Sequence, residues 1–321
     1  MDLPFTVEPA ADGALLHRRG PTPSSALLAH WADGAALPDG LRWAPGTHAV
    51  ERLGPTERVI DVDQTNHSVI VDDRVVVKWT TTPLVGPHPG PERVRRLVEA
   101  GFEAMPAVWF QLEWRTPDGD WVPAASAVDL VPGASDGWTW CLREARIDLG
   151  LVDGPSRPFA SELGLVTARM HRALADPADG LVATHGDYHV GQVLRAESDA
   201  LYVIDFDGNP TLTPAERVAH RPAAYDVAGM LVSLENIGHV VRRYDPDVPE
   251  SAVIAWTDRV HSEFLESYRR EAGDLLEEAL LAPYVDEQID RELAYAAQFL
   301  PAWSYVPEAA LRRRGRIPGE A

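Results

Sequence analysis

Alternating apolar positions between residues 58 and 131 predict a small antiparallel sheet followed by a helical region. Asp72 and Asp73 form a turn between two β-branched runs, and Pro91 stands at the start of a helix predicted at residues 92–98. Strands are predicted at residues 58–62, 68–71, 74–79, 108–114 and 124–131. The second and third of these form a hairpin that ends near Lys78.

Helical spacing dominates the rest of the chain. Long helices are predicted at residues 161–174, 225–241, 251–271 and 275–300. Residues 184–207 are a non-helical insert between the first two, and residues 1–50, rich in Ala, Pro and Gly, carry one short helix at 25–31. The pattern predicts an α+β, two-lobed protein. Its parts are a cap at residues 1–55, a β-rich lobe at 56–132 and a larger helical lobe at 133–321.

The composition is that of a globular protein, with 45% hydrophobic and 24% charged residues. The net charge of −20 disfavours nucleic acid and anionic membranes as partners. No run approaches about 18 apolar residues, and the first residues lack a basic, apolar leader, which predicts a cytoplasmic protein. The single cysteine, Cys141, is interpreted as a small buried hydrophobic residue.

Lysine is used once. Of 29 basic residues, 28 are arginine, and the exception is Lys78 at the end of the predicted hairpin. Such a bias indicates a position where a compact ammonium does something that a planar guanidinium cannot do.

The non-helical insert carries the strongest chemical pattern. Residues 185–192 read HGDYHVGQ, and residues 204–208 read IDFDG. Gln192 follows Asp187 by five positions, as in the kinase pattern H-R-D-x-x-x-x-N, and the second element matches an Asp-Phe-Gly-like metal loop. Phosphoryl transfer needs a base for the acceptor hydroxyl, and Asp187 is the predicted base. It also needs oxygen ligands for Mg²⁺, and the predicted ligands are Gln192, Asp205 and Asp207.

Other interpretations compete for some of these residues. His185 and His189, four apart, resemble a helical zinc pair, but Gly186 and the turn-like surroundings disfavour a helix. Asp226 stands at the start of an apolar helix, where capping is the favoured role. His171 is interpreted as a packed helix residue.

These motifs resemble the aminoglycoside-phosphotransferase-like kinases. They are more similar to actinobacterial maltokinases, which read H-G-D-x-H-x-G-Q-V-L and I-D-F-E-G, and most similar to the glucosamine kinases; the likeness spans residues 56–311. The resemblance implies an ATP- and Mg²⁺-dependent enzyme in which Lys78 binds the α- and β-phosphates. The remaining nucleotide-binding residues that it implies are Gln64, Asn66 and Ser68 in the loop over the phosphates, Glu92 as the partner of Lys78, and Asp129 and Val131 in the adenine hinge. Glu99 and Glu103 are rivals of Glu92.

The predicted acceptor is a sugar, and glucosamine is preferred to maltose. Phosphorylation of glucosamine would give glucosamine 6-phosphate. Maltokinases carry the pattern Y-E-x-x-x-R-P-x-W, whereas residues 295–303 here read YAAQFLPAW, so two polar groups are lost. His189, Gln298 and Trp303 are assigned to the acceptor site, Trp303 with helix packing as its alternative. Candidates for a carboxylate that binds the amine are Asp226, Glu235 and Glu308.

Three other functions stay open from the sequence. They are maltose phosphorylation, phosphotransfer to an aminoglycoside and a kinase-like protein that binds nucleotide without catalysis. Retention of Lys78, Asp187, Gln192 and Asp205 disfavours the last of these, because an inactive protein is free to lose them.

Overall fold

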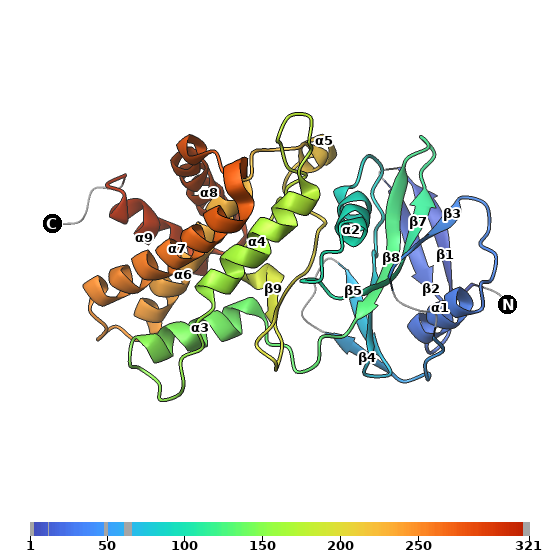
Figure 1. Cartoon of the computed structure of the whole chain (residues 1–321). Helices are drawn as coiled ribbons and strands as arrows, with labels where there is room; N and C mark the ends of the chain where they lie inside the picture. The colour runs from blue at the N-terminus through green and yellow to red at the C-terminus, as the bar shows by residue number, and fades with distance from the viewer. Residues whose placement is uncertain (1–2, 12, 48–50, 61–65, 317–321) are drawn as a thin grey trace. The chain divides into compact units, whose positions relative to one another are not determined.

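The computed structural model describes residues 3–11, 13–47, 51–60 and 66–316 (Figure 1). The chain forms two compact units. Unit 1 comprises Met1–Pro132 and Phe206–Ala219, and unit 2 comprises Gly133–Asp205 and His220–Ala321. The segment Phe206–Ala219, which the sequence pattern assigned to the helical lobe, therefore belongs to the β-rich unit.

A six-stranded antiparallel sheet with the order β3-β7-β8-β6-β5-β4 forms the centre of unit 1. The strands are β3 (Leu41–Pro45), β4 (Glu57–Ile60), β5 (His67–Val71), β6 (Val75–Trp79), β7 (Val108–Arg115) and β8 (Trp121–Asp129). Asp72 and Asp73 have φ values of 53° and 49°, which suits the tight turn between β5 and β6. Val77 and Trp79 are fully buried in the core, so strand alternation places Lys78 on the opposite face of the sheet.

The N-terminal region is part of unit 1 rather than a separate cap. It contains the hairpin β1 (Phe5–Ala10) and β2 (Gly13–Arg18) and the helix α1 (Pro23–Ala32). Phe5, Leu27 and Leu28 lie in the same hydrophobic core as the sheet, and β3 pairs with β7. The sequence pattern predicted only the helix, because these short strands lack a clear run of β-branched residues and β3 pairs with a strand far away in sequence.

Unit 1 also contains the helix α2 (Pro89–Glu99), which packs near β8. His88 caps its start, since the His88 Nδ1 accepts a hydrogen bond from the backbone N–H of Gly90 at 3.3 Å. Arg93 and Leu97, one turn apart, are its buried long side chains, whereas Glu92 and Arg95 face solvent.

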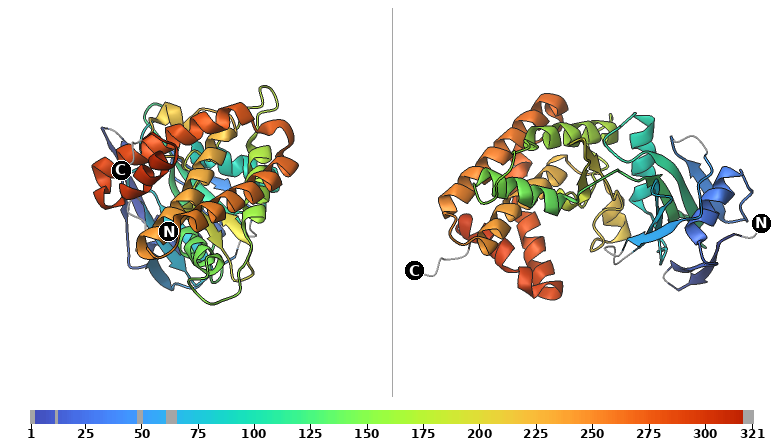
Figure 2. Two further views of the ribbon diagram at one scale, coloured as in Figure 1. Left: turned by 90° about the vertical axis from the view of Figure 1, so that its left-hand side faces the viewer. Right: turned by 90° about the horizontal axis from the view of Figure 1, so that it is seen from below.

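Unit 2 is mainly helical, and the four predicted long helices are present (Figure 2). Its helices are α3 (Gly137–Asp148), α4 (Ala160–Leu174), α6 (Ala224–Tyr244), α7 (Glu250–Ala272), α8 (Glu278–Phe299) and α9 (Tyr305–Arg313). The helix α6 is buried along most of its length and packs against α3, α7, α8 and α9. This central helix is the support on which the catalytic motif rests.

Short elements complete the chain. The non-helical insert contains the 3-10 turn η1 (Val190–Gln192) and the hairpin of β9 (Val193–Arg195) and β10 (Leu201–Val203). The others are α5 (Pro214–Val218) in unit 1 and the 3-10 turns η2 (Gly273–Leu275) and η3 (Pro301–Trp303) in unit 2. Cys141 is fully buried on α3, as predicted. Across the described ranges, no helix has the length and apolar character needed to cross a membrane.

Candidate active site

The predicted site residues are divided between the two units. Unit 2 holds Asp187, Gln192, Asp205 and the acceptor-binding candidates, and unit 1 holds Asp207 and the nucleotide-binding candidates. Gln64 lies outside the described residues.

Asp226 on α6 anchors the start of the catalytic motif. Its Oδ2 accepts a hydrogen bond from the backbone N–H of His185 at 2.6 Å, and its Oδ1 accepts one from Gly186 at 2.9 Å. His171 Nε2 lies 3.2 Å from Oδ2, and the His171 Nδ1 contacts the hydroxyl of Tyr268 at 2.7 Å. Burial alone would raise the pKa of Asp226, but the hydrogen bond and charge of His171, with the other neighbours, hold it below its usual value.

Two predictions about Asp226 are corrected by these contacts. The side chain is 1% exposed, so it is not available to bind a sugar. It also does not cap its own helix, because it stands in the first turn of α6 and bonds to backbone N–H groups of another segment. Its role is to fix the backbone next to Asp187. His171 is a packed helix residue, as predicted.

The rest of the catalytic motif contacts α6 and the segment that leads into Asp205. A Cβ atom at Gly229 would lie 2.7 Å from the carbonyl oxygen of Tyr188, so a glycine permits the close approach of loop and helix. The backbone N–H of Val190 donates to Ser233 Oγ at 3.1 Å. His185 Nε2 donates to the carbonyl of Ile204 at 2.9 Å, which ties the motif to the strand that leads into Asp205.

Asp187 remains partly accessible on this fixed loop, with a side chain that is 28% exposed. The His189 Nδ1 accepts a hydrogen bond from the N–H of Gly191 at 3.0 Å, so the neutral ring carries its proton on Nε2. That Nε2 lies 4.0 Å from Asp187 Oδ2. Asp187 is thus a partly accessible carboxylate beside a polar imidazole, and its role as the base stays a prediction.

The histidine pair does not form a helical zinc site. Residues 185–189 are not helical, His185 Nε2 bonds to a carbonyl, and His189 caps η1. Among the described residues, no three His, Cys, Asp or Glu side chains converge as metal ligands.

The proposed magnesium ligands suit that ion chemically. Asp205 is exposed and has a φ of 64°, a left-handed conformation that costs an L-residue about 1 kcal/mol and that Asp tolerates better than most residues. Gln192 ends η1, and its carbonyl accepts from the N–H of Ile204 at 3.0 Å. Mg²⁺ typically takes one or two carboxylates together with water and phosphate oxygens, so the amide of Gln192 and the carboxylates of Asp205 and Asp207 are ligand types that this ion accepts.

Lys78 forms an ion pair with Asp207, with 3.1 Å between Nζ and Oδ2. The predicted partner, Glu92, instead binds Arg95 on the exposed face of α2, so this prediction was wrong. Glu99 also pairs with Arg95, and Glu103 is exposed beyond the helix. Helical spacing did not reveal which face of α2 is buried, and that face carries Arg93.

The other nucleotide-binding candidates lie on the same sheet. Ser68 on β5 is directly opposite Lys78 on β6, and Asn66 immediately precedes β5. Asp129 ends β8, and its Oδ1 accepts a hydrogen bond from the indole N–H of Trp109 at 2.7 Å. Val131 is buried two residues later. The structure thus places Ser68 next to Lys78 and gives Asp129 a structural contact, and the adenine hinge stays a prediction.

Glu235 is an internal ion-pair residue and not an acceptor ligand. It is 1% exposed, and its Oε2 accepts from Arg314 Nη2 at 2.8 Å, while Arg313 and His239 lie at 3.4 and 3.5 Å. These contacts join α6 to the end of α9. Burial tends to raise the pKa of Glu235, but His239 and the two arginines lower it to about 2. The prediction of amine binding by this residue was therefore wrong.

Glu235→Gln is expected to lower the stability of the protein and to change its acid dependence. The folded-state pKa of about 2 lies below the ordinary value of 4.5, so the stabilisation is complete above pH 4.5 and is lost as the pH falls toward 2. The free energy of unfolding, measured by urea titration between pH 7 and 3, should fall less steeply in the variant. An unchanged slope would contradict this role.

Glu292 is the carboxylate that the sequence analysis missed. It lies on α8 and accepts hydrogen bonds from Asn236 Nδ2 at 2.8 Å and from Gln288 Nε2 at 3.0 Å. Burial raises the pKa of Glu292 above its usual value, while these two donors and the charges of His189 and Arg291 act in the opposite direction. Burial therefore disfavours the charged form of this carboxylate, which interacts electrostatically with His189 of the catalytic motif. The available sequence signal was the pair Gln288 and Glu292, one turn apart.

Aromatic residues adjoin the same region. Trp303 in η3 contacts Trp138 edge to face, with 5.5 Å between ring centroids. A Cβ atom at Gly191 would lie 3.0 Å from the Trp138 Nε1, so Trp138 borders the catalytic motif.

Gln298 is exposed near the end of α8, and Glu308 forms a surface pair with Arg312 at 3.7 Å. Trp303 thus keeps its assignment to the acceptor side as a prediction, whereas Glu292 is better placed than Glu308 for an amine.

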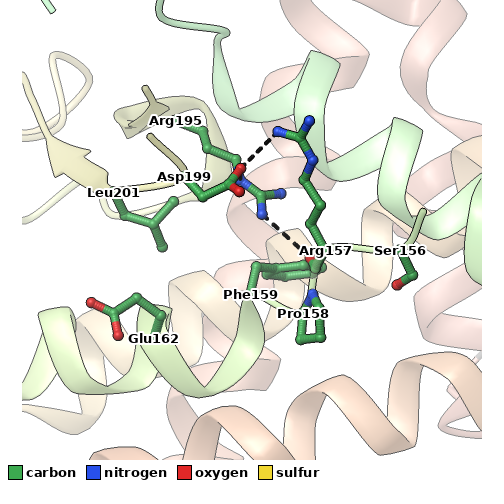
Figure 3. Close-up of a pocket in the computed structure, with 8 residues that line it drawn as sticks. All are labelled: Ser156, Arg157, Pro158, Phe159, Glu162, Arg195, Asp199 and Leu201. Atoms are coloured by element: carbon green, nitrogen blue, oxygen red, sulfur yellow. Dashed lines mark hydrogen bonds and ion pairs between the residues drawn. The ribbon is translucent and has the colours of Figure 1, made fainter. Parts of the chain in front are cut away.

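A separate cavity of about 340 Å³ lies elsewhere in unit 2 (Figure 3). It is lined by residues of the segments 156–162 and 195–201, and Arg157 and Arg195 both contact Asp199 there. None of its lining residues belongs to the predicted site, so this cavity is distinct from the candidate active site.

Comparisons with known proteins identify similar sequences and folds. A glucosamine kinase of Streptacidiphilus jiangxiensis is 37% identical, over 93% of this chain and 78% of that protein. A glucosamine kinase of Mycolicibacterium smegmatis is 34% identical, over 88% of this chain and 89% of that protein. The solved structure of a glucosamine kinase in complex with glucosamine, ADP and inorganic phosphate matches with a TM-score of 0.81 and 29% identity, over 98% of this chain and 92% of that one. No family model matches the chain.

Proposed function

The chain belongs to the glucosamine kinase family, and from this premise we propose that it transfers the γ-phosphate of ATP to the 6-hydroxyl of glucosamine with Mg²⁺ as cofactor. Glucosamine kinases at this level of identity support the reaction, and the structure of such an enzyme with glucosamine and ADP supports the two substrates.

The observation that carries the choice of acceptor is the environment of Glu292. Glucosamine is protonated near neutral pH and bears an ammonium next to its hydroxyl groups. Glu292 offers a carboxylate with a raised pKa, held in place by Gln288 and Asn236 and close enough to His189 for electrostatic interaction. An ammonium would stabilise the charged form of this carboxylate through a charge-assisted hydrogen bond. Glucose and maltose have no such group.

In the proposed reaction, Asp187 receives the proton of the acceptor hydroxyl as its oxygen forms a bond to the γ-phosphorus. The bond between that phosphorus and the bridging oxygen of ADP breaks, and ADP leaves with the electron pair. Anchoring by Asp226 keeps the Asp187 backbone in place, so little reorganisation is needed when charge develops. His189 Nε2, 4.0 Å from Asp187, donates toward the same region and orients the acceptor.

On the nucleotide side, Lys78 would contact the phosphates from its strand, with Asp207 as its ion-pair partner. Gln192, Asp205 and Asp207 would hold Mg²⁺. When bound, this ion offsets the negative charge of the phosphates. Ser68 lies opposite Lys78 on the neighbouring strand and Asn66 directly precedes that strand, and both are proposed to contact the nucleotide.

The test is a coupled ADP-release assay with glucosamine, glucose, maltose and kanamycin as acceptors. Glucosamine should give the highest kcat/KM. A higher value for maltose or kanamycin would overturn the choice of acceptor, and no ADP release with any of the four would contradict the reaction class.

Glu292→Gln is expected to reduce kcat/KM for glucosamine by about tenfold or more, because a hydrogen bond to a charged group is lost. This reduction should come mainly from a higher KM for glucosamine. The activity on glucose should not change, because glucose has no amine. Glu287→Gln, an exposed position on the same helix, is the matched control and should behave as the parent enzyme. An equal loss on glucosamine and glucose would show that Glu292 acts through structure and not through the amine.

A further inference from the structure

Arg93 is a buried arginine that the proposed reaction does not use. Its residue is 2% exposed, and it projects from α2 toward the segment Phe206–Ala219 of the same unit. Its Nη1 donates to the carbonyl oxygen of Phe206 at 2.8 Å, and its Nη2 donates to that of Arg217 at 2.8 Å. A planar guanidinium is suited to such a fork, because its donors are fixed relative to one another.

The two carbonyls belong to residues at the two ends of the loop that carries Asp207. Phe206 directly precedes Asp207, and Arg217 lies in α5, where the loop ends. A single side chain therefore fixes both ends of the twelve-residue stretch from Phe206 to Arg217, whose second residue is a proposed magnesium ligand. Hydrogen bonds from a charged donor are among the stronger ones, and their removal takes a donor away from each of these two carbonyls.

Asp207 itself lies against the start of α2. A Cβ atom at Gly90 would lie 2.4 Å from Asp207 Oδ1, so the carboxylate occupies the space that glycine leaves open. The Asp207 Oδ2 pairs with Lys78 at 3.1 Å, and the charge of Asp207 raises the pKa of His88 against the stronger lowering effect of burial. Within unit 1, the start of α2 and Lys78 thus border the carboxylate of Asp207, and Arg93 holds the backbone carbonyl of the residue before it.

We propose that Arg93 is the positioning residue of the metal loop, and that α2 controls the place of Asp207 through this guanidinium instead of through a glutamate bound to Lys78. Glu92, Glu99 and Glu103 face away or pair elsewhere, so α2 has no glutamate in that role. The inference rests on the proposed function in one respect, that Asp207 binds the magnesium of the nucleotide.

The experiment measures binding of a non-hydrolysable ATP analogue by calorimetry, with and without Mg²⁺, and hydrogen exchange over residues 206–217. In Arg93→Met, the Kd measured with Mg²⁺ should rise about tenfold or more, as is typical when a residue that orients a metal ligand is lost. The Kd without Mg²⁺ should not change, and exchange over the loop should accelerate. Arg93→Lys should show an intermediate effect, because an ammonium lacks the fork that reaches both carbonyls.

The matched control is Arg95→Met, which removes an arginine from the exposed face of the same helix. If Arg93→Met shows the Kd and exchange of Arg95→Met, the proposal is wrong. If Arg93→Met does not fold, Arg93→Lys decides, and equality with the parent protein in both measurements overturns the proposal. These measurements need no sugar, so their failure is distinct from failure of the acceptor assay, which would concern the proposed reaction alone.

Discussion

Asp187→Asn is expected to reduce turnover by roughly 10²- to 10⁴-fold, the usual contribution of a general base. The amide has almost the same shape but does not accept the proton of the hydroxyl. The carboxylate is partly exposed, and its loop is anchored by Asp226 and Ser233 through backbone groups, so the substitution should leave the fold unchanged. Steady-state ADP release under saturating ATP measures the effect.

Two control measurements accompany this variant. The melting temperature and the Kd of the ATP analogue should match those of the parent enzyme, because neither depends on proton acceptance. Turnover within about threefold of the parent value would show that Asp187 is not the base.

Asp226→Asn is expected to lower the free energy of unfolding by about 3 kcal/mol, the lower end of the cost of breaking a buried pair. The amide has one acceptor oxygen, so its NH₂ group must face the N–H of either His185 or Gly186, or the ring of His171. Turnover should fall as well, because the backbone beside Asp187 loses its anchor. Urea titration at pH 7 gives the stability, and ADP release gives the activity.

The acid dependence distinguishes this effect from general loss of packing. The pKa of Asp226 lies below its usual value in the folded protein, so the stabilisation is present above that usual value and is lost as the pH falls through the folded-state value. The difference in stability between parent and variant should therefore narrow in acid. Glu308→Gln, which removes a surface pair, should change stability by less than about 1 kcal/mol at any pH. An equal difference at pH 7 and in acid would contradict the assigned role of Asp226.

Local chemistry explains why the sequence was sufficient for the catalytic motif and its hairpin. The spacing from Asp187 to Gln192 and the IDFDG element are contiguous, and their residue types are required by phosphoryl transfer itself. The turn at Asp72 and Asp73 and the β-branched runs beside it also act over a few residues. The structure confirms the turn and the hairpin, which are encoded close together in the chain, and the catalytic roles of Asp187, Gln192 and Asp205 stay predictions.

The role of each carboxylate was decided by partners that are distant in sequence. Asp226 and Glu235 stand on one apolar helix and look equally suitable as ligands, but the first binds backbone N–H groups about 40 residues away and the second binds arginines of α9. A charged group must be paired when it is buried, and the sequence does not show which group is buried or what pairs with it. Glu292 was missed for the same reason, since its donor Asn236 lies on another helix.

The sequence alone therefore predicted the kinase class, the long helices of unit 2 and the hairpin that carries Lys78. The tertiary structure decided that α2 turns Arg93 inward and Glu92 outward, because both positions have plausible helical spacing and only packing against the sheet and the segment Phe206–Ala219 separates them. Burial of a guanidinium costs less when backbone carbonyls accept its hydrogen bonds, and those carbonyls come from a segment more than 100 residues away.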